Sequence, residues 1–374
     1  MKKVYLDNAA TTPMRFEVIS EMVKVLHENY GNPSSTHSFG RHAKNNIELS
    51  RKSIAKEFNV SAQEIIFTSG GTEANNWILR NAVKNLKVER IITSKIEHHA
   101  VLHAVEALQS EFKLIVHYVK TKSDGAIDVG DLVTLLSEEQ TTLVSLMHVN
   151  NEIGTVSDLQ SIARICKQHQ AYFHSDTVQS IGKISLDLQQ IPIDFLVASA
   201  HKFHGPKGIG FAFIRKGLSM HPLFYGGEQE KGLRPGTESI HNIVGMAKAL
   251  ELACAEMAVQ KEYILSLKKY LLELLDIHFH GFKINGNPEG FYNLINVLLP
   301  IGADKTTMIL FHLDMKGIAV SRGSACQSGS TKPSHVLAEM LSEEDLKKPS
   351  LRISFSHYNT KEDVDCLIEV LKTL

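Results

Sequence analysis

Seven short apolar runs, rich in branched residues, recur through the first part of the chain, and they restrict its possible folds more than any other feature. Segments with apolar residues three and four positions apart separate several of these runs, as with Ile162, Ile165 and Cys166. Strands that alternate with helices predict a mostly parallel α/β sheet, here with seven buried strands. The runs lie at 64–67, 90–93, 114–119, 143–149, 171–174, 195–198 and 209–214, and one face of a first helix carries Ile19, Met22, Val23 and Leu26.

Beyond residue 240 the pattern changes. A helical pattern runs from Ile240 to about Leu275 without a proline and predicts one or two helices that lead away from the sheet. Short strands at 294–298, 318–321 and 351–355 and helices at 306–314 and 361–371 follow. Because 374 residues are too many for one compact core, we expect two domains. The large α/β domain takes residues 14–255, and a smaller α+β domain takes residues 1–13 and 256–374.

Composition and charge exclude several classes of function. A chain with 43% hydrophobic and 22% charged residues is globular rather than disordered. Its formal net charge of -1 gives no basic excess for binding a phosphate backbone, so no direct contact with nucleic acid is expected. No apolar run approaches membrane-spanning length, and residues 4–6 leave no room for a signal-peptide core before Asp7. We therefore expect a cytoplasmic protein without a membrane partner.

Lys202 lies where an apolar strand gives way to a glycine-rich turn, in the run from Ser199 to Gly210. Upstream, Asp176 follows the strand-like segment 171–175. An amine for the cofactor aldehyde and a carboxylate for the pyridine nitrogen are the two groups that a pyridoxal phosphate enzyme needs. A lysine before a turn is by itself more often a solvated surface charge, so this interpretation depends on the rest of the chain.

A glycine turn offers a site for the cofactor phosphate. The segment 69–73, Ser-Gly-Gly-Thr-Glu, follows an apolar strand and opens a helical pattern. Free N–H groups at the start of a helix bind anions, and the helix dipole adds to the attraction. The alternative is an ordinary turn capped by Thr72. Ser199 and His201 lie just before Lys202 and offer further donors.

The four cysteines differ in their surroundings. They have no CxxC spacing, so neither a disulfide framework nor a metal site is expected. Cys166, Cys254 and Cys366 fall in helical patterns among apolar residues, where cysteine behaves as a small buried hydrophobe. Cys326 instead lies among glycine, serine, alanine and glutamine, a pattern that predicts an exposed loop and a reactive thiol.

Taken together, these motifs and several others resemble the NifS-like cysteine desulfurases. They occur in the family's order over nearly the whole chain. The resemblance implies a fold-type-I, pyridoxal phosphate-dependent homodimer that moves sulfur from L-cysteine to acceptor proteins. The matching segments are Asn8–Pro13, Tyr30–Ser35 with His37, Thr68–Glu73, Glu97 with His98, His148–Gly154, Asp176 with Gln179, His201 with Lys202, Arg234–Thr237 and Gly323–Cys326.

The resemblance also implies a role for each matching residue. Lys202 holds the cofactor aldehyde, and Asp176 lies beneath the pyridine nitrogen, where its charge favours the protonated ring. His98 stacks on the ring and carries protons; without the resemblance, it is as readily a helix cap. The other implied contacts are Asn151 and Gln179 near the ring oxygen, Gly71, Thr72, Ser199 and His201 at the phosphate, Thr237 at the phosphate of the other subunit, and Arg352 with Asn151 at the substrate carboxylate.

The resemblance also assigns a role to Cys326, which takes up the sulfur. The resemblance implies that its thiolate attacks the sulfur of bound cysteine, which leaves a persulfide on Cys326 and yields L-alanine. Segment 324–334 is long enough to carry this thiol to a partner, as in the branch of the family associated with iron–sulfur cluster assembly and tRNA thiolation. Thr177 and Val178 after Asp176 are a small departure from the family. Gln327 and Gly329 also depart from its commonest loop residues and leave the acceptor open between an iron–sulfur scaffold and a tRNA-thiolation enzyme.

Two other functions stay open at this point. An aminotransferase or another lyase of the same fold shares every motif except a use for Cys326. A non-catalytic scaffold needs none of Lys202, Asp176 and His98, and it would be colourless when purified. The loop cysteine argues against the first alternative, and the presence of all these groups together argues against the second.

Overall fold

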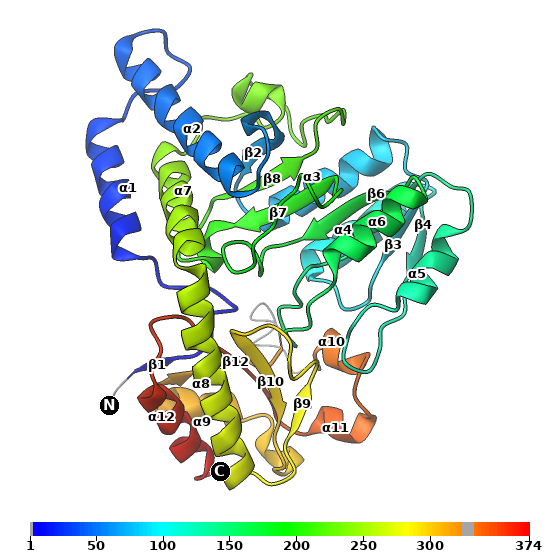
Figure 1. Ribbon diagram of the computed structural model, residues 1–374, viewed down its shortest axis with the longest axis vertical. Helices are drawn as coiled ribbons and strands as arrows, with labels where there is room; N and C mark the ends of the chain where they lie inside the picture. The colour runs from blue at the N-terminus through cyan, green and yellow to red at the C-terminus, as the bar shows by residue number, and fades with distance from the viewer. Residues whose placement is uncertain (1–2, 324–332) are drawn as a thin grey trace.

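A seven-stranded sheet forms the centre of the larger part of the molecule (Figure 1). The computed structural model describes residues 3–323 and 333–374, so Cys326 lies outside the described residues. β8 runs antiparallel to β2 and β7, and the other neighbours are parallel. This confirms the predicted mostly parallel α/β sheet. The strand order is β2 (Ile65–Thr68), β8 (Gly210–Ile214), β7 (Phe195–Ser199), β6 (Tyr172–Asp176), β5 (Thr142–Ser145), β3 (Arg90–Thr93) and β4 (Ile115–Tyr118).

Apolar cores cover both faces of this sheet. In β7, Leu196 and Ala198 enter one core, and Phe195 and Val197 enter the other, because successive side chains of a strand point to opposite faces. The first core is completed by α1 (Phe16–Glu28), α2 (Ser38–Glu57), α5 (Val129–Leu136), α6 (Leu159–Gln168) and α7 (Ile240–Ala255). The second core is completed by α3 (Gly71–Lys84) and α4 (His99–Glu111).

One sequence prediction about burial is wrong. The strand β4 is not buried, since it lies at the sheet edge and leaves Ile115 and Tyr118 41% and 38% exposed. The residues of α1 that are buried in the first core are Val18 and Val25. Of the predicted apolar face, Met22 packs against the core, whereas Ile19, Val23 and Leu26 are exposed.

A second, smaller sheet lies at the other end of the molecule (Figure 1). Its antiparallel strands, in the order β12 (Ser350–Ser354), β10 (Leu294–Leu298) and β9 (Lys283–Asn285), share a separate apolar core with α8 (Met257–His278), α9 (Ile309–Met315) and α12 (Lys361–Leu371). β1 (Val4–Tyr5) pairs in parallel with β11 (Ile318–Ala319) and adds Val4 to this core. The short helices α10 (His335–Ala338) and α11 (Glu343–Lys347) lie beside it.

The long helical pattern after residue 240 forms two helices, α7 and α8, with the change at Glu256. The domain boundaries at residues 14 and 256 stay a prediction. Cys166 is buried, as expected, whereas Cys254 and Cys366 are only partly buried. Throughout residues 3–323 and 333–374, no helix combines the length and the apolar character required to cross a membrane.

Candidate active site

A cavity of about 210 Å³ opens where β6 and β7 end. The carboxyl ends of parallel strands meet at one edge of a sheet, which is where ligands bind in open α/β folds. The cavity brings together predicted site residues from distant parts of the chain; their roles stay predictions. These residues are Gly71, Thr72, His98, Asn151, Asp176, Gln179, Ser199, His201, Lys202 and Arg352.

Asp176 is the last residue of β6, and its side chain is held at both oxygens. The backbone N–H of Val178 donates to Oδ1 at 3.0 Å, and Asn75 Nδ2 donates to Oδ2 at 2.8 Å. The carboxylate is therefore fixed in orientation beside the cavity. Sequence reasoning missed Asn75, although it follows Gly71 by four positions on α3 and so lies on the same face of that helix.

Lys202 ends the short turn Ala200–Lys202 that follows β7. Its Nζ donates to the backbone oxygens of Ala9 and Ala10 at 2.7 and 2.8 Å. Gln179 Nε2 also donates to the Ala9 oxygen, at 2.9 Å. The N-terminal segment therefore supplies the acceptors that hold the lysine amine at the cavity, a contact that the sequence motif did not predict.

His98 has two functions in the fold. Its Nδ1 accepts a hydrogen bond from the N–H of Ala100 at 3.1 Å, so it caps α4, as the alternative interpretation proposed. Its ring also lines the cavity. Burial lowers the pKa of His98 against the opposing effect of Asp176, and the charge of Lys202 lowers it further. A neutral ring that accepts at Nδ1 carries its proton on Nε2.

The glycine turn presents the start of α3 to the cavity. Gly70 is the N-cap residue with φ at 152°, a conformation that other L-residues rarely adopt, and it provides no side-chain bond to the first turn. A Cβ on Gly71 would lie 2.6 Å from Val178 Cγ2. The alternative in which Thr72 caps the turn is wrong, because Thr72 lies inside the helix. Ser199 and His201 line the same cavity, and burial, with nearby lysines, lowers the pKa of His201 to about 4.

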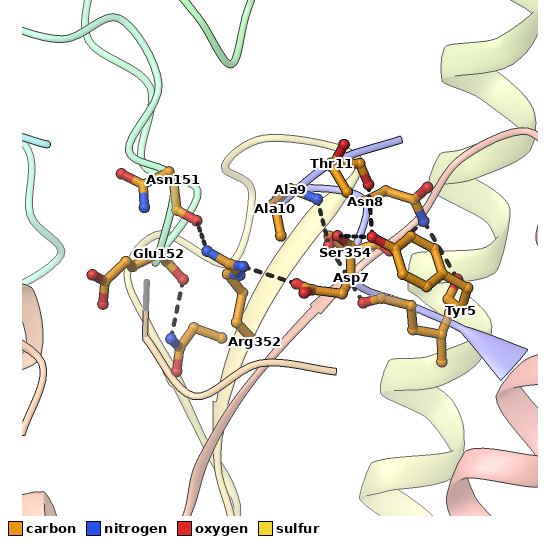
Figure 2. A network of polar contacts seen from close by, with 12 residues as sticks. Tyr5, Asp7, Asn8, Ala9, Ala10, Thr11, Asn151, Glu152, Arg352 and Ser354 are labelled. Atoms are coloured by element: carbon orange, nitrogen blue, oxygen red, sulfur yellow. Dashed lines mark hydrogen bonds and ion pairs between the residues drawn. The ribbon is translucent and has the colours of Figure 1, made fainter. Parts of the chain in front are cut away.

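Arg352 comes from the smaller sheet and lines the same cavity. Figure 2 shows the polar contacts that it makes. It lies within β12, and its residue is only 1% exposed. Nη1 donates to the Asn151 backbone oxygen at 3.0 Å, and Nη2 lies 2.8 Å from Asp7 Oδ1. The sequence gave no sign of the partner Asp7.

Two predicted residues do not line this cavity in the described structure. Thr237 is exposed and lines a separate cavity of about 70 Å³ together with Thr68 and Ser69. Cys326 lies outside the described residues. Within the described ranges, no group of three or more histidine, cysteine or acidic side chains is arranged to hold a metal ion.

Comparison with known proteins places the fold and the site in a class. Among solved structures, a NifS-like protein superposes with a TM-score of 0.91 at 37% identity, covering 100% of this chain and 99% of that one. A structure described as SspA in complex with cysteine superposes with a TM-score of 0.82 at 32% identity, covering 96% and 100%. The fold is that of the fold-type-I pyridoxal phosphate enzymes.

The family follows from the sequence comparisons. The model of the aminotransferase class-V family matches residues 4–367. The cysteine desulfurase IscS of Dictyoglomus turgidum is 42% identical over 383 residues, which cover 100% of this chain and 94% of the relative. The cysteine desulfurase IscS of Methanosarcina thermophila is 42% identical over 373 residues, which cover 99% and 91%. The chain belongs to the aminotransferase class-V family, and its relatives are cysteine desulfurases.

Proposed function

We propose that this protein is a pyridoxal phosphate-dependent cysteine desulfurase. The observation that carries the proposal is one cavity that contains the amine of Lys202, the fixed carboxylate of Asp176 and the buried guanidinium of Arg352. An amine and a carboxylate suit the two polar ends of the cofactor ring, and a guanidinium suits the carboxylate of an amino acid.

The described residues fit pyridoxal phosphate. The start of α3 offers backbone N–H groups without a competing side-chain cap, and Ser199 and His201 lie at the same cavity. Asp176 would lie beneath the ring nitrogen and His98 against the ring face, with Gln179 and Asn151 near the ring oxygen. When bound, the cofactor supplies an electron sink that stabilises negative charge on the substrate Cα.

Side chains of the protein bind the substrate and transfer its protons. Arg352 binds the substrate carboxylate with two parallel hydrogen bonds, in place of the bond that it now makes to Asp7. Lys202 takes the Cα proton, since an unprotonated lysine amine can act as a general base. The carbonyls of Ala9 and Ala10 then hold the resulting ammonium group, as they hold Nζ here.

Cys326 is the proposed sulfur acceptor within the enzyme. Its thiolate forms a bond to the substrate sulfur while the carbon–sulfur bond breaks. The electron pair of the broken bond goes to the substrate Cβ, which takes up a proton, and the Lys202 ammonium group returns a proton to Cα to complete L-alanine. The sulfur remains on Cys326 as a persulfide and passes to the thiol of an acceptor protein.

The partners are proposed on the same basis. The enzyme acts as a homodimer in which Thr237 of each chain reaches the phosphate in the other, because Thr237 is exposed and lines no part of its own chain's large cavity. The acceptors serve iron–sulfur cluster assembly or tRNA thiolation. A persulfide carrier needs free thiols, which supports a reducing, cytoplasmic location.

Product analysis tests this function. The purified protein should be yellow and should convert L-cysteine into equal amounts of alanine and, with a reductant present, sulfide. Cys326→Ser should keep the yellow colour and lose sulfide release, because a hydroxyl stays protonated near neutral pH. Cys366→Ser is the matched control and should keep its activity. Amino exchange with a keto acid in place of sulfide release would identify an aminotransferase, and a colourless protein would identify a scaffold.

A further inference from the structure

The connection between β8 and α7 contains a run of unusual backbone. Glu230, Lys231 and Gly232 have φ values of 46°, 60° and 75°, all in the left-handed region. That region costs conformational energy for residues with a Cβ, and Glu230 and Lys231 both have one. A turn of this kind persists only when surrounding contacts hold it in place.

A buried ion pair supplies those contacts. Arg51, on α2, donates from Nη2 to Glu230 Oε1 at 2.6 Å and from Nη1 to Oε2 at 2.7 Å. The backbone N–H of Phe67 also donates to Oε2, at 2.9 Å. Both charged side chains are almost fully buried, at 3% and 2% exposed. Burial alone would lower the pKa of Arg51, but the hydrogen bond and charge of Glu230 raise it above its ordinary value.

The ion pair anchors one end of an arm that consists of residues 229–237. Next to it, Gln229 Oε1 accepts a hydrogen bond from the Gly236 N–H at 3.0 Å and so closes the arm on itself. Arg234 Nε donates to Glu73 Oε1 at 3.0 Å, which ties the arm to the first turn of α3. Although burial would raise it, hydrogen bonds from Arg234 and Ser69 hold the pKa of Glu73 below its ordinary value.

Thr237 lies at the end of this arm and is exposed. The three anchors fix the backbone that leads to it, while its hydroxyl stays available at the surface. A buried ion pair is weak evidence for stability, because removing two charges from water is costly. However, the three hydrogen bonds to the Glu230 carboxylate, two from Arg51 and one from Phe67, are directional. They therefore fix one backbone path for the arm, whereas non-directional apolar packing would not.

We propose that Glu230, held by Arg51, is a positioning residue that aims Thr237 at the cofactor phosphate of a second copy of this chain. The inference rests on the proposed function and its dimer. Glu230 therefore acts between subunits. Substitution of Glu230 in one chain weakens phosphate binding in the site that contains the Lys202 of the other chain.

The first test separates phosphate binding from folding. We expect Glu230→Gln and Glu230→Ala dimers to bind pyridoxal phosphate about tenfold more weakly, as expected for loss of a hydrogen bond to a charged group. Their affinity for pyridoxal, which lacks the phosphate, should stay at the wild-type value. Glu48→Ala is the control, because Glu48 is the other, partly exposed partner of Arg51 and lies on α2 rather than in the arm. An equal loss of affinity for both compounds would overturn the proposal.

Mixed dimers test the direction of the effect. One dimer pairs a Glu230→Gln chain with a Lys202→Ala chain, so the single lysine-bearing site receives its arm from the chain with intact Glu230. The other dimer pairs a wild-type chain with a chain that carries both changes. Its single lysine-bearing site therefore receives the arm with Glu230→Gln. Cofactor retained on the lysine-bearing chain is measured by mass spectrometry after borohydride trapping. We expect wild-type affinity in the first dimer and about tenfold weaker binding in the second.

The outcomes separate this inference from the function on which it rests. The reverse order of affinities would show that Glu230 acts within its own chain, and the inference would be wrong while the enzyme assignment stood. Equal weakening in both dimers, with a matching loss of thermal stability, would make the ion pair purely structural. A wild-type chain that is monomeric or binds no pyridoxal phosphate would instead refute the proposed function itself.

Discussion

The two sides of the cavity hold their charged groups in different ways. On the side of the seven-stranded sheet, Asp176 receives one bond from the backbone of its own turn and one from Asn75. On the side of the smaller sheet, Arg352 is held by Asp7 and by the backbone oxygen of Asn151 (Figure 2). Asp176 therefore depends on neutral donors that no ligand needs to displace, whereas Arg352 is paired with a carboxylate that resembles the one it would bind in a substrate.

This difference indicates a division of labour. Fixed dipoles around a charge give an environment that needs no reorganisation during a reaction, which suits a permanent cofactor. Pairing with a carboxylate lowers the free energy needed to bury a guanidinium, and the guanidinium can then exchange one carboxylate for another. This arrangement suits a substrate that binds and is released in each turnover. Four predictions test whether the two sides differ in this way.

Lys202→Ala should have the largest effect. Loss of the amine removes both the covalent attachment and the general base, so turnover of cysteine should fall by about 10⁴-fold or more. Release of alanine, measured by chromatography, gives the rate. Lys207→Ala, which changes an exposed lysine five positions further along the chain, should leave the rate unchanged. Alanine formation at the normal rate by Lys202→Ala would remove this residue from the mechanism.

Asp176→Ala should come next, with a loss in kcat of about 10²–10³-fold, the usual consequence of losing one fixed electrostatic group. The cofactor should still bind through the phosphate contacts. Asn75→Ala removes only one of the two bonds to this carboxylate and should lower kcat about fivefold. If Asn75→Ala were as inactive as Asp176→Ala, the role of the sheet side would be to orient the carboxylate rather than to supply its charge.

Arg352→Lys should affect the substrate rather than the cofactor. A lysine cannot form the two parallel bonds of a guanidinium, so the KM for cysteine should rise about 10- to 100-fold with a smaller change in kcat. Asp7→Asn should have the opposite effect and lower this KM about twofold, because the competing carboxylate is gone. A rise in KM for Asp7→Asn would show that Asp7 orients Arg352 and does not compete with the substrate.

Two buried lysines provide the smallest expected effect. Burial and the charge of Lys202 lower the pKa of Lys183 to about 7, and burial lowers the pKa of Lys268, in the smaller core, to about 8. At a pH between these lowered pKa values and the ordinary lysine pKa of 10.5, the unfolded chain binds more protons than the folded chain. The free energy of unfolding therefore rises with pH over that range.

The experiment measures urea unfolding at pH 7 and pH 9. The wild-type protein should gain about 1–3 kcal/mol more than Lys183→Met over this interval, since the variant lacks the titrating amine. Lys202→Ala should reduce the contribution of Lys183 and leave that of Lys268 unchanged, because, of these two lysines, only Lys183 has its pKa lowered by the charge of Lys202. An equal response of both lysines would mean that only burial matters.

Local patterns predicted most of the fold. The central strands β3 and β7 came from runs of branched residues, and α12 came from its apolar periodicity. The predicted run 143–149 extends beyond β5, which ends at Ser145, because apolar composition alone does not show where a strand leaves the sheet. The apolar residues predicted on one face of the first helix do lie in α1, but Ile19, Val23 and Leu26 are exposed. Periodicity shows which residues share a face and not what covers it.

The sequence by itself determined the chemistry at the cavity: the lysine after a strand, the carboxylate at a strand end and the glycine turn that opens a helix are all local patterns. The tertiary structure decided which groups hold them. Ala9 and Ala10 bind a lysine more than 190 positions away, and Asp7 pairs with Arg352 across 345 positions. No local pattern encodes such contacts, because they arise only when the sheets and the N-terminal segment pack together and buried polar groups must find partners.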